Sequence, residues 1–379
     1  MVSIKMDSLV TNPISLQIRC ITNRSTRPRG SYVKALMTNR ILIVRLSAIG
    51  DCILSVPVLN SIRRNFPIAR VGWVIEKASS QLIQGHSALD DLFVISKQTF
   101  KSPRQLWKLA GQLRAWKPDV TLDLQGLTKS SILAWLSGAK SRLGFHRDEF
   151  DGRELSRFLN NRLYAPESEH IVDRSLELLK LLGVEDPAAE FNLPEQEKDA
   201  AFAERVQKLS SLEGRFAIIN VGAGWTSKLW PMERYASVVK HLSEYWGLPC
   251  LVVWSGEQEN LVAKQIVSAC QRHAVLSPPT TLLQLASLIR RASLFVGSDT
   301  GPMHLSVAVG TPTVGIIGPM PIERVCPYGP RSRGVQRTRL TKGSDRKKDC
   351  APMLSIDSDS VIQACDQLMS GSKFNRLAS

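Results

Sequence analysis

Several features are missing from this sequence, and each absence excludes a class of protein. Among its 379 residues, no apolar run approaches the roughly 18–20 residues that a membrane-spanning helix needs. The N-terminus has scattered Arg and Lys but no continuous apolar stretch, which argues against a cleaved secretory signal. The seven cysteines form no C-x-x-C pair and no Cys/His cluster at zinc spacing, so a metal site is not supported. An odd cysteine count without a pairing framework is typical of a reducing cytoplasm, where we expect free, mostly buried thiols.

A dinucleotide-binding fingerprint is missing as well. The sequence has no G-x-G-x-x-G, and no carboxylate stands where a dinucleotide fold would bind its ribose. This argues against an oxidoreductase that uses NAD(P), and no other cofactor is indicated. A nucleic-acid-binding protein is disfavoured too, because the chain contains no recognised reader motif.

The positive charge, a formal +15, is concentrated in two segments. Residues 1–38 carry six basic side chains against Asp7 alone, and residues 331–348 carry eight against Asp345 alone. The rest of the chain is therefore only mildly basic. These segments are either solvated tails or surfaces that attract a phosphate-rich partner or an anionic membrane face, and the sequence leaves both open.

The chain divides into two halves in which apolar strands alternate with helices. Its composition, 43% hydrophobic and 22% charged, is that of a globular protein, and its length favours two domains. Continuous apolar runs predict buried parallel strands, at 41–46, 71–76, 92–96, 120–126, 216–222, 250–256, 293–298 and 311–318. Segments between them have the 3.6-residue period of helices. This alternation indicates βαβ units on parallel sheets, which bind ligands at the carboxyl ends of their strands.

We therefore predict an α/β fold with two Rossmann-like, doubly wound parallel-sheet domains that face a central cleft. The predicted parts are a flexible basic extension, a first domain, a linker, a second domain, and a C-terminal helix with a tail, at 1–38, 39–185, 186–205, 206–352 and 353–379. Met37 stands just before the first strand, and a start of translation there is a hypothesis about the gene.

The first half carries a polar turn directly after its first predicted strand. In RLSAIGD (45–51), Gly50 permits close approach to the backbone, and Asp51 follows it at the carboxyl edge of the sheet. Asp51 is either a catalytic base that faces the cleft or a cap for free N–H groups of the next helix. Spacing alone leaves both interpretations open.

A second polar segment, DLQGLTKSS (123–131), ends another strand of the first half and contains Gln125 and Lys129. Several basic residues follow it, namely Arg142, His146, Arg147, Arg153, Arg157 and Arg162. They form either a solvated basic loop or a guanidinium-rich pocket for carboxylates or phosphates, which the fork geometry of arginine suits.

The segment GSDTGPMH (297–304) indicates an anion site in the second half. A predicted strand ends just before Asp299, and Pro302 suits the first turn of a helix, where its missing N–H is tolerated. Such a helix directs free N–H groups and a partial positive charge toward the strand edge, where phosphate binds readily. His304, one turn in, either reaches the same anion or is structural, and Asp299 either contacts a ligand or caps the helix.

A glycine turn and one lysine stand in VGAGWTSKLWP (221–231), directly after another strand. The turn and Lys228 fit a pyrophosphate held by backbone amides and a point charge, although a surface charge is the usual interpretation of such a lysine. Glu259, beyond the strand at 250–256, is placed either to accept hydrogen bonds from a ribose or to serve as an ordinary acid at a helix N-terminus.

In their order and spacing these segments resemble one family. From about Arg40 to Leu368 the chain is similar to the heptosyltransferases that build the lipopolysaccharide inner core, which belong to glycosyltransferase family nine and have the GT-B fold. The resemblance rests on RLSAIGD, DLQGLTKS, KLWP and GSDTGPMH, and PYGP (327–330) is similar too.

The resemblance implies a role for each candidate residue. Asp51 would be the general base, and Lys228 would neutralise the leaving diphosphate. The implied donor contacts are Gly222, Ala223, Gly224, Lys228, Glu259, Thr280, Asp299, Thr300, Gly301 and His304. The implied acceptor contacts are Gln125, Lys129 and Arg153. An insertion near Glu259 could shift its ribose-binding role to Glu257, and Thr280 falls where a backbone group reads the adenine edge.

The resemblance further implies an inverting, metal-independent transfer of L-glycero-D-manno-heptose from ADP-heptose to the Kdo/heptose inner core of lipopolysaccharide, without a cofactor. The partners would be the nucleotide sugar, a phosphorylated or carboxylated lipid-linked glycan and an anionic membrane face, with no nucleic acid. We expect a cytoplasmic protein with peripheral contact to the inner membrane. The alternative is a family-nine enzyme with another nucleotide sugar and another cell-surface glycan. Departures from the family pattern are the leading extension, the missing hydroxyl pair in VGAGWTS and the basic stretch 331–350.

Overall fold

The structure, a computed structural model, describes residues 39–148 and 150–377. The extension predicted for residues 1–38 and the hypothetical start at Met37 lie outside these residues. In the described part of the chain, no helix is long and apolar enough to cross a membrane.

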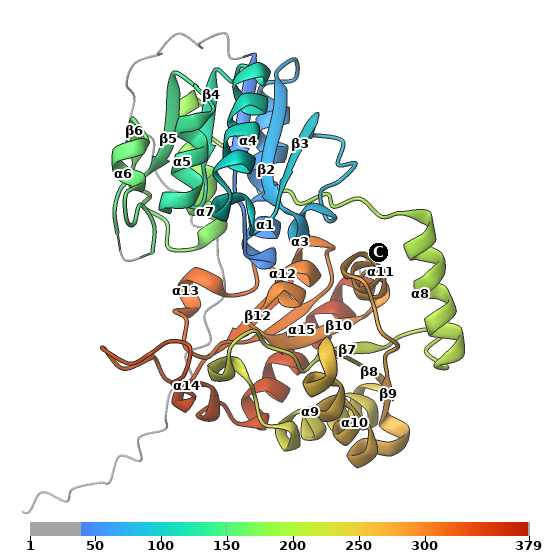
Figure 1. The fold of residues 1–379 in the computed structure, drawn as a ribbon. Helices are drawn as coiled ribbons and strands as arrows, with labels where there is room; N and C mark the ends of the chain where they lie inside the picture. The colour runs from blue at the N-terminus through green and yellow to red at the C-terminus, as the bar shows by residue number, and fades with distance from the viewer. Residues whose placement is uncertain (1–38, 149, 378–379) are drawn as a thin grey trace, which may run out of the picture.

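The first domain is built on a six-stranded parallel sheet with the strand order β3-β2-β1-β4-β5-β6 (Figure 1). Its strands are β1 (Arg40–Val44), β2 (Arg70–Glu76), β3 (Asp91–Ile95), β4 (Val120–Asp123), β5 (Ser141–Phe145) and β6 (Arg162–Tyr164). Its helices are α1 (Ile49–Leu54), α2 (Val56–Asn65), α3 (Lys77–Ser80), η1 (Thr99–Lys101), α4 (Pro103–Trp116), α5 (Thr128–Leu136), α6 (Ser156–Leu159), α7 (Ile171–Glu177) and η2 (Leu178–Leu182).

The second domain repeats this plan with the order β12-β11-β10-β7-β8-β9. Its strands are β7 (Ala217–Asn220), β8 (Cys250–Val253), β9 (Ala274–Leu276), β10 (Leu294–Ser298), β11 (Thr313–Ile316) and β12 (Ser332–Val335). Its helices are α8 (Glu197–Leu209), η3 (Thr226–Lys228), α9 (Met232–Trp246), α10 (Gly256–Cys270), η4 (Gln271–His273), α11 (Leu282–Arg291), α12 (Gly301–Ala308), α13 (Ile322–Val325), α14 (Ala351–Leu354) and α15 (Ser358–Leu377).

The strand order places a topological switch point in each sheet. In the first domain β1 lies between β2 and β4, and in the second β7 lies between β8 and β10, so the winding reverses direction at both places. Connections leave opposite faces of the sheet there and open a crevice at the carboxyl ends of the strands, where ligands of such folds bind. The predicted α/β fold with two doubly wound parallel sheets is confirmed.

All eight predicted strands are present, and four strands were not predicted. The unpredicted ones, β5, β6, β9 and β12, include three sheet edges. The helix expected from Cys52 onward is divided into α1 and α2, because Pro57 has no N–H to donate to the carbonyl of Ile53. Gly50 and Asp51, placed in a turn by the sequence analysis, lie in the first turn of α1 instead. The segment 186–205 includes the first residues of α8, which packs against α11.

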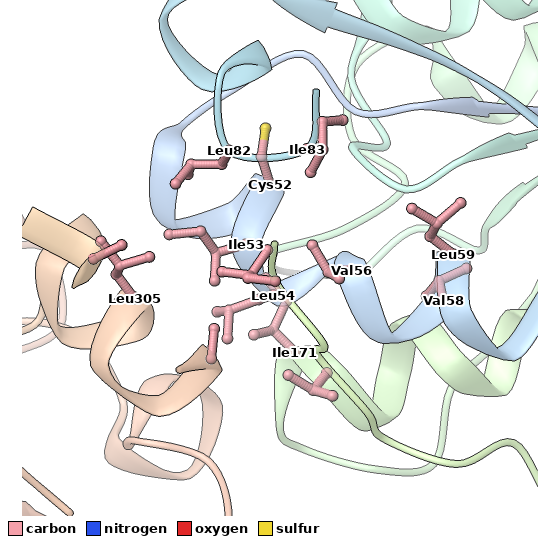
Figure 2. Close-up of a cluster of buried hydrophobic side chains, with 14 of the residues drawn as sticks. Cys52, Ile53, Leu54, Val56, Val58, Leu59, Leu82, Ile83, Ile171 and Leu305 are labelled. Carbon is pink, nitrogen blue, oxygen red and sulfur yellow. The ribbon is translucent and has the colours of Figure 1, made fainter. Parts of the chain in front are cut away.

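A continuous apolar contact joins the two domains. Helix α1 of the first domain packs against α12 of the second, and their buried side chains belong to one hydrophobic cluster. Figure 2 shows Leu305 of α12 on the side of α1 that carries Ile53. Because α1 and α12 each follow a strand at a switch point, this contact brings the two switch points together.

A second, polar contact joins the domains on the side of α7 and α13. The buried carboxylate of Asp151 in the first domain binds Arg174 at 2.9 Å and Arg324 of α13 at 2.9 Å. Beside it, the Tyr328 hydroxyl donates to Asp173 of α7 at 2.6 Å. Removing one partner from such a buried network leaves an uncompensated charge, so these contacts restrain the relative position of the domains.

Among the described residues five cysteines are free, and four of them are buried: Cys52, Cys250, Cys270 and Cys365. The fifth, Cys350, is partly exposed. Cys326 is not among the free thiols, and Cys20 lies outside the described residues.

Candidate active site

A cleft of about 920 Å³ lies between the two domains, where the carboxyl ends of both sheets face each other. Predicted site residues that line it are Gly50, Lys129, Gly222, Ala223, Gly224, Glu259, Thr280, Thr300 and Gly301. Others stand outside the lining, namely Asp51, Gln125, Arg153, Lys228, Asp299 and His304. The cleft is therefore built from the segments that follow β1, β7, β8 and β10, together with the start of α5 and the residues before α11.

Asp51 directly follows the lining residues Ala48, Ile49 and Gly50 in the chain. Its side chain is 40% exposed, and Oδ2 accepts a 2.9 Å ion pair from Arg45 and a 3.2 Å hydrogen bond from the N–H of Ala48. Oδ1 has no partner within the described residues. Asp51 therefore does help to cap α1, as one interpretation predicted, but with one oxygen only. The other oxygen remains available to accept a proton.

Arg45 fixes the position of the Asp51 side chain. It is the first residue after β1 and is almost fully buried, and its guanidinium also donates to the carbonyl of Leu124, just after β4. Because the side chain bridges the two strands of the switch point, it holds the Asp51 carboxylate at that edge. The neighbouring thiol is not a competing nucleophile, since burial raises the pKa of Cys52 to about 12.

A buried network of Lys228, Asp299 and His304 lies beneath the second-domain wall of the cleft. Lys228 Nζ binds Asp299 Oδ2 at 2.6 Å and the Asp299 carbonyl at 2.8 Å. His304 Nε2 lies 3.1 Å from Asp299 Oδ1, while the buried Nδ1 of the same ring has no hydrogen-bond partner in the part of the chain that the structure describes. Burial alone would raise the pKa of the Asp299 carboxyl, but Lys228 and His304 hold it well below its usual range. The predicted motifs KLWP and GSDTGPMH thus meet in one network.

The start of α12 faces the cleft above this network. Thr300 is the N-cap, and Gly301 and Pro302 form the first turn, so the positive end of the helix dipole points into the cleft. Gly50 of α1 lies so close that a Cβ on it would come within 2.7 Å of the His304 ring. Only glycine allows α1 and α12 to approach in this way, which confirms the close approach expected at Gly50.

Glu259 and the glycine turn 222–224 also line the cleft. A Cβ added to Gly222 would lie 2.0 Å from Glu259 Oε2, so the carboxylate occupies the space that glycine leaves. Oε2 accepts a 2.7 Å hydrogen bond from the N–H of Ser255 just before α10. Burial raises the pKa of Glu259, although hydrogen bonds from Ser255 and Ala223 oppose this. The carboxylate therefore serves as a helix N-terminal acid and also lines the cleft.

On the first-domain side, the structure separates the predicted acceptor residues. Lys129 lines the cleft, with Nζ 5.6 Å from the centre of the Phe100 ring. Gln125 instead accepts a 3.0 Å hydrogen bond from the N–H of Leu46, and so braces the end of β1. Arg153 lies outside the cleft lining, and its backbone N–H donates to the carbonyl of Gly126.

Two of the arginines that the sequence analysis placed either in a solvated loop or in a guanidinium-rich pocket contact the backbone. Arg142 lies on β5 and donates to the carbonyls of Leu159 and Ala139 at 2.8 and 2.9 Å. Arg162 lies on β6 and donates to the carbonyl of Leu181. Both guanidiniums therefore bind backbone carbonyls beside the edge of the sheet.

The sequence analysis missed two cations of the first-domain wall. Lys97 and Lys101 line the cleft together with Lys129, and Glu76 and Ser79 lie on the same wall. Lys97 comes two residues after β3, so the rule that ligands bind at the carboxyl ends of parallel strands could have identified it. Among the described residues, no group of three or more His, Cys, Asp or Glu side chains could hold a metal ion.

Comparison with known proteins gives a consistent result. The family model for glycosyltransferase family 9 (heptosyltransferase) matches residues 106–354. The lipopolysaccharide heptosyltransferase 1 of Pseudomonas aeruginosa is 26% identical over 325 residues, 83% of this chain and 86% of that protein. The lipopolysaccharide core heptosyltransferase OpsX of Haemophilus influenzae is 26% identical over 291 residues, 76% of this chain and 81% of that protein.

Solved structures share the fold. A glycosyl transferase family 9 protein from Veillonella parvula has a TM-score of 0.75 at 22% identity and covers 88% of this chain and 98% of its own. The E. coli heptosyltransferase WaaC with ADP has a TM-score of 0.67 at 20% identity, with 87% and 98% covered. The same enzyme with ADP-2-deoxy-2-fluoro heptose has a TM-score of 0.65 at 22% identity, with 86% and 99% covered.

Proposed function

The chain belongs to glycosyltransferase family 9, and from this premise we propose that it transfers L-glycero-D-manno-heptose from ADP-heptose to the inner core of lipopolysaccharide, with inversion at the anomeric carbon. The observation that carries the proposal is the pairing of an open carboxylate, Asp51, with a cationic network and a helix N-terminus across one cleft. The names of the relatives, lipopolysaccharide heptosyltransferases, support the choice of sugar and acceptor.

The second-domain wall suits the donor. Backbone amides of the turn 222–224 and the N-terminus of α12 offer N–H donors to a diphosphate. An ammonium has three N–H donors, and Lys228 gives two of them to Asp299, which leaves the third for a phosphate oxygen. Glu259 accepts hydrogen bonds from the ribose hydroxyls, and the backbone at Thr280 faces the base. The complex of the similar WaaC with an ADP-heptose analogue supports this class of donor.

The first-domain wall suits an anionic acceptor. Lys97, Lys101 and Lys129 line it with positive charge, and Asp51 stands at its edge beside the start of α1. An acceptor held by these lysines presents its hydroxyl to Oδ1 of Asp51. Peripheral contact with an anionic bilayer would bring a lipid-linked acceptor to this wall.

The chemistry then needs one base and a stabilised leaving group. Asp51 Oδ1 takes the acceptor proton while the hydroxyl oxygen forms a bond to the anomeric carbon from the face opposite ADP. The bond from that carbon to the diphosphate oxygen breaks, and its electron pair leaves with ADP. Lys228 and the α12 N-terminus stabilise the charge that grows on the diphosphate. Domain closure around the bound substrates would limit access of water, which would otherwise hydrolyse the donor.

The direct test is product analysis. Purified protein is incubated with ADP-heptose and a defined Kdo-containing lipid A acceptor, and in parallel with UDP- and GDP-sugars. We expect one heptose to be added to the acceptor, with release of ADP, and the opposite anomeric configuration to that of the donor. Transfer from a UDP- or GDP-sugar, with none from ADP-heptose, would replace the proposal with the alternative family-nine reaction on another glycan.

A further inference from the structure

The segment between β12 and α14, residues 336–350, is the most basic exposed part of the second domain and is here named the basic loop. It carries six Lys and Arg side chains against Asp345 and Asp349. In Figure 1 it projects away from the sheet on the side of α13 and α14. Neither the donor site nor the catalytic base uses any of its residues.

A cavity of about 310 Å³ lies under the basic loop. Its cations are Arg339, Lys342 and Arg346, and no Asp or Glu is among its lining residues. Its apolar side is formed by Pro319, Met320, Pro321 and Leu340. The volume is about ten times that of a water molecule, which leaves room for a phosphate and an attached sugar.

The cations of this cavity have different partners. Arg339 pairs with Glu323 of α13, which lies outside the lining, whereas Lys342 is exposed and has no ion pair within the described residues. The Arg346 guanidinium is held 4.8 Å from the centre of the Phe150 ring. A phosphate in the cavity would accept charge-assisted hydrogen bonds from side chains that line it, and no carboxylate of the lining would repel it.

The position of the basic loop connects the two halves of the proposed reaction. Ser227, the residue before Lys228, binds the loop backbone twice, through its N–H to the Lys347 carbonyl at 3.4 Å and through its hydroxyl to the Arg346 carbonyl at 2.6 Å. On its other side, Arg346 contacts Phe150 of the first domain. The loop therefore extends from the donor lysine to the first-domain loop that contains Arg153.

We propose that this cavity binds a phosphate monoester carried by the acceptor glycan, at a distance from the hydroxyl that reacts. The inference rests on the proposed function, because it takes the acceptor to be an anionic glycan. The donor diphosphate is a poor candidate for the cavity, since none of the residues that line it also lines the interdomain cleft. Contact with Phe150 instead places the cavity beside the first domain, which holds the acceptor.

The test compares two acceptors and two double variants. The acceptors are a delipidated inner-core glycan with its phosphates intact and the same glycan after phosphatase treatment. The test variant is Lys342→Gln with Arg346→Gln. The matched control is Lys208→Gln with Lys264→Gln, which removes the same charge from exposed positions on α8 and α10.

In the test variant we expect the KM for the phosphorylated acceptor to rise about tenfold, as for the loss of charge-assisted hydrogen bonds. The KM for the phosphatase-treated acceptor, the KM for ADP-heptose and the kcat should stay at the wild-type values. The control should leave all of these values unchanged. Equal KM changes for both acceptors, or none, would overturn the proposal.

Two further arms separate the remaining explanations. Binding to phosphatidylglycerol vesicles is measured for both double variants; if the test variant loses vesicle binding while its preference for the phosphorylated acceptor is intact, the cations serve the bilayer and the proposal is wrong. Calorimetric binding of both acceptors is measured without donor. A wild-type preference for the phosphorylated glycan that the test variant lacks supports the cavity even if no heptose is transferred, in which case the proposed function alone fails.

Discussion

Two buried aspartates at matching places in the two domains behave in opposite ways. Asp123 ends β4 and Asp299 follows β10, and these strands occupy equivalent positions in their sheets. Burial raises the pKa of Asp123, whose carboxylate has only neutral partners within the described residues, among them the Asn160 amide at 3.0 Å and the N–H of Gly126 at 2.9 Å. Burial would do the same to Asp299, but Lys228 and His304 hold its pKa well below the usual range.

The different partners of Asp123 and Asp299 point to different roles for the two strand ends. Neutral donors around Asp123 fix a loop and bring no net charge to the cleft. The carboxylate of Asp299 instead holds the Lys228 ammonium beside the cleft wall although burial costs that cation its solvation, and such a site suits an anionic ligand. The first domain instead keeps the carboxylate proposed as the base, Asp51, 40% exposed and its lysines on the surface of the cleft. In the proposed function, the donor half is thus assembled in advance, and the acceptor half is open.

We expect the largest effect from Asp51→Asn, which should remove the proposed base of the first domain and leave the second-domain site intact. An amide oxygen still accepts the hydrogen bond from Ala48, but the almost fully buried Arg45 loses its anionic partner, so we expect the melting temperature to fall while the protein stays folded. Turnover should fall by roughly 10²–10⁴, because the proton of the acceptor hydroxyl has no base. Single-turnover rates and ADP-heptose affinity measure this, and the affinity should survive. A folded, fully active Asp51→Asn protein would remove Asp51 from the mechanism.

Lys228→Ala should affect both rate and stability, because it breaks the network of the second domain. We expect turnover to fall by about 10²–10³ through loss of charge stabilisation on the diphosphate. Stability should fall by about 3–5 kcal/mol, since Asp299 remains buried with His304 as its only side-chain partner. Steady-state kinetics and denaturant unfolding measure the two effects.

The matched control is Asn160→Ala, which removes the neutral side-chain partner of Asp123. It should lower stability by about 1–3 kcal/mol and leave the turnover of folded protein unchanged. Similar rate losses in Lys228→Ala and Asn160→Ala would mean that the two strand ends do not differ in function.

Gly50→Ala tests the contact between the two domains. The new methyl group would come within 2.7 Å of His304, which is buried and cannot move without losing Asp299, so we expect a loss of about 3 kcal/mol. Gly111→Ala on α4 is the control, since its Cβ would meet nothing within 4 Å and alanine favours a helix interior. The control should be neutral or stabilising. A normal unfolding midpoint for Gly50→Ala would show that α1 and α12 are less tightly packed than described.

The smallest effect is a dependence of stability on pH through His170, which lies between the domains and contacts the Cys326 carbonyl at 2.9 Å. Burial lowers its pKa to about 4 from an ordinary value of 6.5. Below pH 6.5 the unfolded chain therefore binds a proton that the folded protein refuses, and stability falls as the pH drops toward 4. We expect about 2 kcal/mol of this loss between pH 7 and 5.

His170→Asn keeps an N-cap for α7 but does not titrate, so its unfolding free energy should fall less over the same pH range. Denaturant unfolding at pH 7, 6 and 5 measures the difference. Parallel pH profiles for the wild type and the variant would contradict the shifted pKa of His170.

The central strands could be predicted from the sequence because helices cover both of their faces. Residues 41–44 of β1 and 217–219 of β7 are continuous apolar runs, without the alternation of polar and apolar residues that a strand with one exposed face shows. β6, β9 and β12 are short edge strands. β5 begins with Ser141 and Arg142, and β6 begins with Arg162. β5, β6 and β12 therefore lack a continuous apolar run, and β9 has only three residues. The sequence left Arg142 and Arg162 either in a solvated loop or in a ligand pocket, whereas both bind backbone carbonyls.

The candidate site was predicted as segments rather than as contacts. The sequence placed Asp51, Lys228 and His304 after the correct strands, because parallel sheets bring those ends to one edge. It did not show that Arg45 holds Asp51 or that Asp299 joins Lys228 to His304, because these pairs depend on side-chain direction across loops. A charged residue directly after an apolar run was the available signal for Arg45.

The contact between α1 and α12 has a consequence for how the two substrates influence each other. Gly50 precedes Asp51, the proposed base, and packs against the His304 ring that contacts Asp299, so a shift of either helix is transmitted to the other. Donor binding at one wall of the cleft and acceptor binding at the other are then linked by a single coupling free energy. Whatever factor donor binding adds to the affinity for the acceptor, acceptor binding must add to the affinity for the donor.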